Sequence, residues 1–557
     1  MSRKSMMWLI IIALLTILTC LYLINNHQEQ ILKPMEEEST LAIYLEDELI
    51  NYIPEKDSGY TLDIEKSSCT NGVEISFDYN TWSVKTNYSN YTYQNNERVK
   101  CSLYFTDKYI EPILNGTDPV LEDPLIPVTI SDDGTVKKAD LSSEWYDYET
   151  KKWANAVILF DETKTYASGD IIPEEEIESY FVWIPKYRYQ LWDLGLYDSL
   201  TEIDTNKVHE IPIIFGDYNT SDSVARECTT PMKSGESGNC QVGDYMTHPA
   251  FLSIPSTGFW VGKFETGYAG ATSTTEAEVN ERDASKVIVK PNVYSWREIQ
   301  VANAFYTTYD YQRDLDSHMM KNTEWGAVAY LEHSAYGSST SVRINNNSSY
   351  ITGYQANEEP TCGYTVTSEE CNRYCSDNTC NQAYPNSVLA STTNNITGIF
   401  DMSGGAWDYV MGVMLDEQGS PMSGQNSLYN SGFNGTFGCP TCNNDASGLT
   451  ELTTGVEFPE EKYYDVYEYS LSEQQYNKRI LGDATGELGP IEEVYYLNRS
   501  KYINSWYSNR SYFLYAYAPW WIRGANYPDG SDTGALAFSD WYGNEDTMFT
   551  FRIILTP

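Results

Sequence analysis

Basic residues are scarce in this sequence. Its 557 residues contain 36 Lys and Arg against 79 Asp and Glu, which gives a formal net charge of −43 at pH 7. A field of that sign repels phosphate backbones, so we expect no nucleic-acid partner. The acidity is typical of a soluble surface protein, and it suits weak binding of divalent cations.

Histidine is scarcer still. The five His residues are scattered and form no close-spaced metal-ligand motif, so a histidine-bound metal centre is not expected. They are His27, His209, His248, His318 and His333. Aromatic residues, by contrast, make up 14% of the chain and include 47 Tyr. Tyr combines apolar area with a polar tip, which suits half-exposed sheets and binding surfaces.

A long apolar run occurs over residues 6–24, which are 19 almost uninterrupted apolar residues. A helix of that length just crosses a bilayer. Arg3 and Lys4 precede the run, so the positive-inside rule places the N-terminus in the cytoplasm and the bulk of the chain outside the cell. We therefore expect residues 1–28 to be a cytoplasmic tip and a single-pass membrane anchor.

Two alternatives to an uncleaved anchor remain open. A cleaved signal peptide usually has a shorter apolar stretch, and no small-x-small cleavage site follows Ile24. Leu18-Thr19-Cys20 is similar to a lipoprotein box, but Thr before the Cys is a poor match. The uncleaved anchor is the preferred interpretation.

Cysteine occurs eleven times, and ten of these residues follow the apolar run. An even number in an exported segment is typical of a disulfide set. Proximity suggests Cys69–Cys101, Cys228–Cys240 and Cys439–Cys442, with two more bridges among Cys362, Cys371, Cys375 and Cys380. The alternatives are a redox-active pair at Cys439 and Cys442, and a zinc site in the group of four. Their surroundings and spacing favour structural bridges.

Composition divides the rest of the chain. Residues 29–42 are polar and acidic and are expected to form a stalk. Residues 43–135 are predicted to form a small all-β domain, because 75–79 and 82–86 alternate around Asn80-Thr81 and 101–105 reads as a further strand. Residues 136–177 follow as a connector, and 178–557 form the main domain. Long loops, where binding surfaces commonly lie, are expected there over 355–385 and 415–450.

Five blocks rich in Trp and Gly follow one another in the main domain, at 259–266, 293–298, 320–330, 398–409, and 523–525 with 551–552. In this order they resemble motifs of the sulfatase-modifying-factor family, for example V-S-W-x-D-A for the second block and G-L-x-N-M-x-G-N-V-W-E-W for the fourth. After the second block, Ile299, Ala302 and Phe305 are spaced as in a helix, with Ser295 as the expected N-cap.

The resemblance implies an α+β fold. The main domain would be a formylglycine-generating-enzyme-like, C-type lectin-like domain, preceded by the small all-β domain and the transmembrane helix. The oxidising enzyme of the family uses a copper-bound Cys pair in the C-terminal part of this domain, and here no Cys follows Cys442. Iron-dependent relatives use a His cluster, which the scattered His residues do not supply. We therefore expect a protein that is not an enzyme.

One metal site is implied by the resemblance. In the family, the fourth block wraps a calcium ion, and the ligands fall on Asp401, Gly404, Ala406 and Asp408 of this sequence. Calcium takes side-chain and main-chain oxygens together, and the Gly404-Gly405 pair lets the backbone curl around an ion. Asp408 replaces the usual Glu and has a shorter reach. The alternative is an acidic Gly-Gly turn without an ion.

Residues 498–511, 526–532 and 539–546 are dense in Asn, Ser, Tyr and Arg, and the apolar stretches 535–538 and 549–555 among them read as strands. Adaptable polar residues beside rigid aromatics are typical of binding surfaces. The pattern is similar to the variable proteins of diversity-generating retroelements; a plain Asn- and Tyr-rich sheet is the alternative. The candidate ligand-binding residues are Trp506, Tyr507, Trp520, Trp521, Tyr527, Trp541 and Tyr542.

These observations together predict a membrane-anchored, extracellular, adhesin- or receptor-like protein that binds a protein or glycan ligand. One alternative is an extracellular enzyme on the same fold, such as a carbohydrate-active enzyme. A deep cleft with two carboxyls of raised pKa would identify it. The other alternative is a structural cell-surface component that self-associates through its Cys-rich loops.

Overall fold

The structure is a computed structural model, and it describes part of the chain in detail. The described residues are 41–45, 48–50, 60–70, 73–78, 83–87, 99–107, 118–191, 210–216, 227–228, 243–252, 256–339, 342–355, 381–416, 430–433, 458–469, 480–485, 509–512, 514 and 518–557. The chain divides into two compact units, Met1–Leu114 and Asn115–Pro557. The predicted anchor lies outside the described residues. Among those that are described, no helix is both long and apolar enough to span a bilayer.

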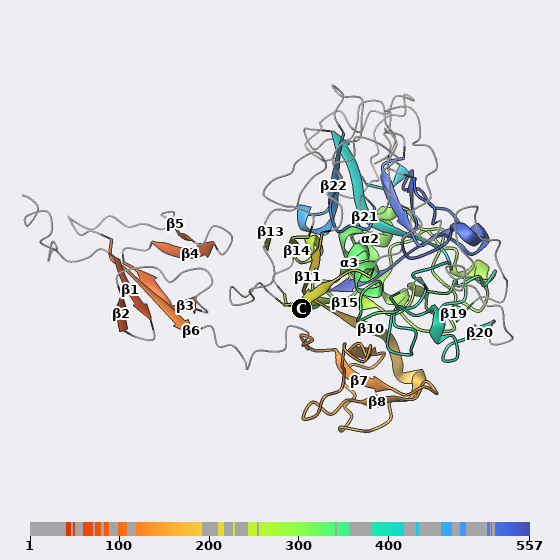
Figure 1. Ribbon diagram of the computed structural model, residues 1–557, viewed down its shortest axis with the longest axis horizontal. Coiled ribbons are helices and arrows are strands. Elements are labelled where there is room, and N and C mark those ends of the chain that lie inside the picture. Colours follow the sequence, from red (N-terminus) through yellow and green to blue (C-terminus); the bar gives the residue numbers. More distant parts are fainter. Residues whose placement is uncertain are drawn as a thin grey trace, which may run out of the picture. The chain divides into compact units, whose positions relative to one another are not determined.

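The first unit is built from strands. One sheet has the order β2-β1-β6-β3, and a separate hairpin joins β4 to β5 (Figure 1). Their bounds are β1 Leu41–Leu45, β2 Glu48–Ile50, β3 Tyr60–Cys69, β4 Glu74–Asp78, β5 Ser83–Asn87 and β6 Cys101–Asp107. The hairpin and the strand at 101–105 confirm the prediction from alternating side chains.

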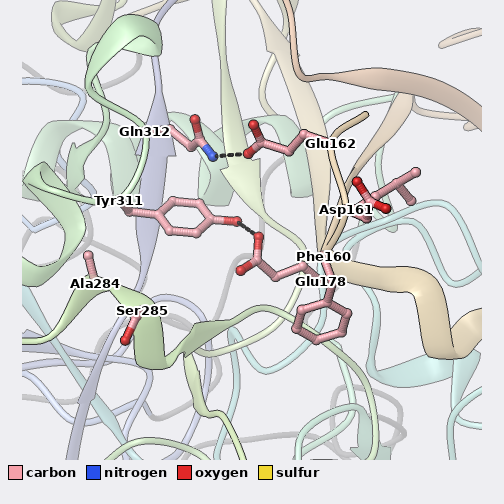
Figure 2. A pocket seen from close by; sticks show the side chains of 9 residues that line it. Phe160, Asp161, Glu162, Glu178, Ala284, Ser285, Tyr311 and Gln312 are labelled. Carbon is pink, nitrogen blue, oxygen red and sulfur yellow. Dashed lines mark hydrogen bonds between the residues drawn. The ribbon is translucent and has the colours of Figure 1, made fainter. Parts of the chain in front are cut away.

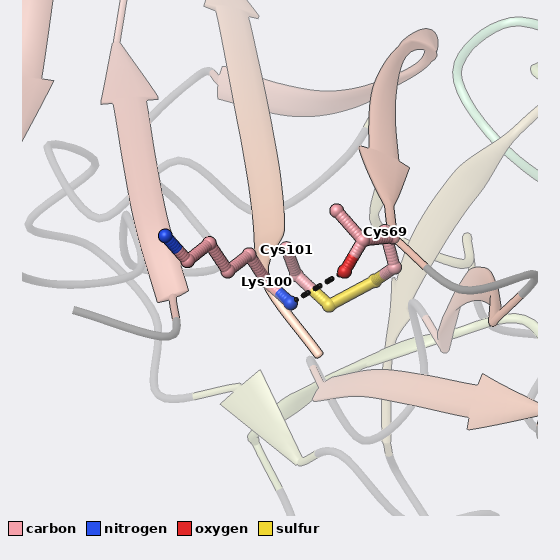
Figure 3. Close-up of a disulfide and its surroundings, with 4 residues drawn as sticks. Cys69, Lys100 and Cys101 are labelled. Atoms are coloured by element: carbon pink, nitrogen blue, oxygen red, sulfur yellow. Dashed lines mark hydrogen bonds between the residues drawn. A yellow bond between two sulfur atoms is a disulfide. The ribbon is translucent and has the colours of Figure 1, made fainter. Parts of the chain in front are cut away.

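A disulfide closes this unit. Cys69 ends β3 and Cys101 begins β6, and the two residues are direct partners in the antiparallel ladder. Their Cα atoms lie 4.1 Å apart, and the bridge is formed (Figure 3). Beside it, the backbone N–H of Lys100 donates to Thr70 Oγ1 at 2.9 Å. This predicted pair is confirmed. Of the remaining predicted partners only the backbone of Cys228 is described, in β13, and the others lie outside the described residues.

The second unit contains a seven-stranded sheet of order β18-β26-β15-β10-β9-β7-β8. Every residue of β9 is buried, and so is all of β10 except Glu178. Near-continuous apolar runs of this kind suit strands that are covered on both faces. The bounds are β7 Ile126–Ile130, β8 Val136–Lys138, β9 Asn155–Leu159, β10 Ile177–Pro185, β15 Gly258–Gly262, β18 His318–Met319 and β26 Ile553–Leu555.

This sheet corrects the expected domain boundaries. Residues 118–135 were assigned to the small β-domain and 136–177 to a connector, but β7, β8 and β9 are hydrogen-bonded into the large sheet. The division between units falls at residue 114 instead of 135 or 178. Strand β10 therefore begins in the interior of a sheet and not at a domain edge. Pairing between distant strands decides the boundary, and composition does not reveal that pairing.

A second large sheet has the order β22-β21-β23-β24, and β25 also pairs with β21. The bounds are β21 Trp407–Asp416, β22 Asp465–Tyr469, β23 Trp520–Arg523, β24 Phe538–Trp541 and β25 Phe549–Phe551. The apolar stretch 549–555 thus forms two strands in different sheets, with Arg552 between them. The predicted strand at 535–538 begins only at Phe538.

The described α-helices are α2 Val301–Tyr309 and α3 Asn322–Glu332 (Figure 1). All residues of α3 are buried. The Trp325 indole N–H donates to Ala535 O at 2.7 Å, and the Tyr187 hydroxyl donates to Ala327 O at 2.7 Å. Helix α2 begins after Gln300, so the prediction of Ser295 as its N-cap is wrong. The Ser295 hydroxyl donates to the carboxylate of Glu265 instead.

Smaller strand groups complete the unit. A four-stranded sheet has the order β12-β11-β14-β13, and two pairs join β16 to β17 and β19 to β20. Their bounds are β11 Tyr187–Gln190, β12 Ile213–Phe215, β13 Glu227–Cys228, β14 Tyr245–Thr247, β16 Gly267–Tyr268, β17 Val287–Ile288, β19 Tyr354–Gln355 and β20 Gln382–Ala383. Within the described residues, many strands and two α-helices agree with a β-rich α+β class, and the C-type lectin topology stays a prediction.

Two buried charged side chains join four of the five Trp- and Gly-rich blocks, and the Met320 backbone N–H of the third block donates to Arg552 O at 3.0 Å. The Arg552 guanidinium donates to Gly262 O at 2.9 Å and to Phe400 O at 3.1 Å, which ties the first, fourth and fifth blocks. The Glu265 carboxylate accepts from Ser295 and from the Ala406 backbone N–H, which ties the first, second and fourth. Each side chain satisfies buried polar groups on several segments. The blocks therefore pack as parts of one unit.

Candidate functional site

Two of the predicted ligand-binding residues are core residues. Trp520 and Trp521 are fully buried in β23, between β21 and β24. The Trp521 ring lies 5.3 Å from that of Tyr467 and 5.6 Å from that of Phe538, centroid to centroid. Both faces of β23 are covered, so neither indole is available to a ligand. Their assignment as ligand anchors is corrected here. Adjacent strand residues point to opposite faces, and the sequence does not show that both faces are packed.

Three other predicted residues keep part of their surface. Tyr527, Trp541 and Tyr542 are half-buried. Trp541 is the last residue of β24, and its ring lies 5.4 Å from that of Tyr542 and 5.0 Å from that of Phe549. We call Trp541 and Tyr542 the aromatic pair. Trp506 and Tyr507 lie outside the described residues.

Tyr527 lies apart from the aromatic pair and contacts Tyr350 instead. It opens the 3-10 helix η10, Tyr527–Asp532, and its ring lies 5.1 Å from that of Tyr350. The Arg297 guanidinium in turn lies 3.9 Å from the centre of the Tyr350 ring. The backbone N–H of Tyr527 donates to Gly405 O at 3.0 Å, which fixes the start of η10 against the fourth block. Tyr527 is therefore presented by a backbone that is held in place.

The fourth block contributes two side chains to a cluster of buried carboxyls. Asp401 and Asp408 are both buried, and Gly404 and Gly405 have φ of +82° and +76°, as expected for a tight curl. Burial and the nearby charges of Asp401 and Asp408 raise the pKa of Glu265 well above its usual value. Burial also raises the pKa of Asp408, to about 7, against the opposing effect of Arg552.

The predicted calcium ligands fit an ion only in part. Both carboxylate oxygens of Asp408 are buried without a hydrogen-bond partner among the described residues, as a cation ligand would be. The Asp401 carboxylate, however, already accepts hydrogen bonds from Asn345 and Gly353 at 2.9 Å. Arg552 also places a positive charge 3.8 Å from Asp408. In the described part of the chain, no three His, Cys, Asp or Glu side chains gather as a metal site. Calcium binding stays a prediction.

A cavity that the sequence did not indicate lies beside the start of β10. Its volume is about 450 Å³, and three acidic side chains line it, Asp161, Glu162 and Glu178. Figure 2 shows Tyr311 pointing toward Glu178 and Gln312 pointing toward Glu162. The Gln312 amide donates to Glu162 at 2.9 Å, and the Tyr311 hydroxyl donates to Glu178 at 3.2 Å. We call this cavity the acidic pocket.

Glu178 differs from the two other acids of the pocket. Asp161 and Glu162 are exposed on the turn after β9, whereas Glu178 is half-buried at the start of β10. Burial raises the pKa of Glu178 to about 7, with a smaller contribution from the charge of Glu162. Perturbed carboxyls in cavities are common at functional sites.

The pocket combines four segments that lie far apart in the sequence: residues 159–162, 178, 284–285 and 311–312. None carries a motif, and the charge of Glu178 alone marks it as unusual within an apolar strand. No model of a known protein family matches this chain, and no curated protein matches it either. The resemblance to the sulfatase-modifying factors therefore stays a prediction.

Proposed function

We propose that this protein is a membrane-anchored, extracellular, non-catalytic ligand-binding protein akin to the sulfatase-modifying-factor family. The observation that carries the proposal is the aromatic pair at the end of β24. Trp541 and Tyr542 keep part of their surface, while the strand that presents them is paired residue by residue with the buried strand β23. Large aromatic side chains on a rigid strand lose little conformational entropy on binding.

The surroundings of the pair support a role in recognition. The loop that follows contains Asn544, Glu545 and Asp546, which supply hydrogen-bonding groups beside the rings. Two contacts hold this loop in place: Asp546 O accepts from the Glu298 N–H at 3.0 Å, and Asn544 O accepts from the Tyr409 hydroxyl at 2.9 Å. A fixed loop of polar groups next to aromatic anchors is typical of binding surfaces.

The test is capture of ligands by the full-length chain on glycan and protein arrays. We expect the wild type to capture a defined ligand and the double variant Trp541→Ala/Tyr542→Ala to lose it. Tyr294→Ala is the matched control, because Tyr294 is a half-buried tyrosine outside the predicted face. Thermal unfolding of all three proteins checks that the fold is kept. Equal capture by the wild type and the double variant would contradict the proposal.

Calcium at Asp401, Gly404, Ala406 and Asp408 is a second part of the proposal. The ion would balance the buried carboxyls and hold the curl at Gly404-Gly405, without taking part in chemistry. Equilibrium dialysis against radioactive calcium measures it directly. We expect binding by the wild type and a loss in Asp408→Asn. The absence of bound calcium in the wild type at millimolar concentration would remove this part and leave ligand capture unaffected.

One observation favours an enzyme as the second candidate function. The acidic pocket holds Glu178, whose pKa is raised to about 7, together with Glu162. A protonated acid beside a second carboxyl is the arrangement that glycoside hydrolysis uses. A panel of chromogenic glycosides tests it. Turnover that is lost in Glu178→Gln would establish the enzyme and reject the non-catalytic function.

A further inference from the structure

The acidic pocket is separate from the aromatic pair and from the fourth block, and the non-catalytic function proposed above leaves it without a ligand. It is a cavity of about 450 Å³ with three carboxyls on its walls. Among the described residues that line it, none is Lys, Arg or His. Small-molecule sites commonly have volumes of about 300–1,000 Å³. The pocket is therefore large enough for a small organic group.

Lys290, which lies near Phe160, and Lys164, whose charge acts on Asp161, are both paired with other acids. Lys290 Nζ lies 3.3 Å from Glu174 and also donates to the Glu174 and Ile177 carbonyls. Lys164 Nζ lies 2.8 Å from Glu176. Asp161, Glu162 and Glu178 have no ion pair of this kind among the described residues. The negative charge of the pocket is thus left for a ligand to balance.

The walls of the pocket are not those of a metal site. Leu159 and Phe160 supply apolar surface, and Phe160 is 56% exposed although it is a large apolar side chain. An aromatic ring attracts organic cations through its face. One ammonium already lies near this ring, since Lys290 Nζ is 5.7 Å from its centre. Apolar and aromatic surface beside carboxylates suits an alkyl chain that ends in a positive charge.

We propose that the acidic pocket binds an organic ammonium group, with Glu162 and Glu178 as its carboxylate partners and Phe160 against its alkyl part. The ammonium belongs to a lysine side chain or to an amino sugar, since both present the same group. Each N–H donates to a carboxylate oxygen, which gives charge-assisted hydrogen bonds. The site is independent of the ligand captured by the aromatic pair.

Binding at this site depends on pH. The groups that face Glu178 are the Tyr311 hydroxyl, Glu162 and Asp161 on the turn after β9, and Lys290 beyond β17. Burial holds the pKa of Glu178 at about 7 without a ligand, and a bound cation lowers it by favouring the carboxylate. The lysine amine stays protonated throughout this range. The affinity for the lysine peptide therefore increases as pH rises from 6 to 8.

The experiment is isothermal titration of the full-length protein with two amine probes and their neutral counterparts. The probes are acetyl-Gly-Lys-Gly amide and glucosamine, and the counterparts are the N-ε-acetylated peptide and N-acetylglucosamine. We expect saturable binding of at least one amine with a dissociation constant below about 1 mM and none of its acetylated form. The stronger of the two amines identifies the source of the ammonium.

Two variants locate the binding site. Glu162→Gln and Glu178→Gln keep the side-chain shape and remove one charge each, and we expect affinity to fall at least about tenfold in each. Glu178→Gln should also lose the increase in affinity between pH 6 and 8. Glu149→Gln, an exposed acid that does not line the pocket, is the matched control and should bind like the wild type.

Several outcomes would overturn the proposal. Equal binding of the amines and their acetylated forms would show a neutral ligand site. If both Gln variants bind the amines as the wild type does, the ammonium binds elsewhere. If neither amine binds at about 10 mM, the pocket does not bind an ammonium group. Because Glu162 is exposed, its variant does not endanger the fold, so a loss of binding there reports on the site.

Discussion

The buried side chain of Arg552 offers the most demanding stability test, through the substitution Arg552→Met. Its guanidinium is fully buried, lies 3.8 Å from Asp408, and donates to three carbonyl oxygens, Gly262 O, Phe400 O and Asp401 O. Methionine fills much of the volume and leaves Asp408 without its counter-charge. Removing one partner of a buried ion pair costs about 3–5 kcal/mol, so we expect a loss of about 4 kcal/mol at pH 8.

The sign of the pH dependence is a second part of this prediction. The pKa of Asp408 is about 7 in the folded protein against a usual value of 3.8, so the folded state binds a proton that the unfolded state has released. The raised pKa of Asp408 therefore makes the wild type less stable as pH rises from about 4 to about 7. Without Arg552 the pKa of Asp408 rises further, because the opposing charge is gone. The defect of Arg552→Met should therefore be smaller at pH 5 than at pH 8.

The assay is urea unfolding followed by tryptophan fluorescence at both pH values. All of the 14 Trp residues except Trp8 and Trp82 lie in the larger unit, so the signal reports mainly on that unit. Arg313→Met is the matched control, because Arg313 forms an ion pair with Asp310 but its side chain is 60% exposed. Exposed pairs contribute about 0–1 kcal/mol. If Arg552→Met behaves like the control at pH 8, or is worse at pH 5, the reasoning is refuted.

Three further predictions follow from single features. The Cys69–Cys101 bridge closes a loop of 32 residues, so its replacement by two Ser should cost about 3–4 kcal/mol and expose the first unit to limited proteolysis. Trp521→Ala should destabilise the larger unit by about 3–5 kcal/mol in urea unfolding, since the side chain is fully buried; a stable variant that has lost only ligand capture would restore Trp521 as an anchor. Burial raises the pKa of Asp465 to about 6, so stability falls by up to about 3 kcal/mol between pH 4 and 6. Asp465→Asn should flatten that slope, and an unchanged slope would exclude Asp465 as its source.

Local features of the fold could be predicted from the sequence. The hairpin β4-β5 follows from alternating side chains around a polar turn, and the Cys69–Cys101 bridge follows from proximity within one exported segment. Both depend on residues that are close along the chain. The short distance limits the number of alternative pairings, and pattern reasoning then succeeds.

Long-range features could not be predicted in the same way. Strands β7 and β9 join a sheet that also contains β18 at His318–Met319 and β26 at Ile553–Leu555, and no composition change marks that pairing. Trp520 and Trp521 became candidate anchors because they lie in a region dense in aromatic and polar residues, whereas the structure buries both. The acidic pocket unites four distant segments. The strand pairing, the burial of the two Trp residues and the pocket all depend on tertiary packing, which the local sequence does not encode.

The most direct test of ligand binding by the aromatic pair is the equilibrium affinity of the full-length chain for the captured ligand. Tyr542→Ala removes a half-buried ring at the predicted face, and Tyr294→Ala removes one elsewhere. We expect the first to weaken binding at least about thirtyfold and the second less than about threefold. Equal affinities of the two variants would contradict binding at the end of β24.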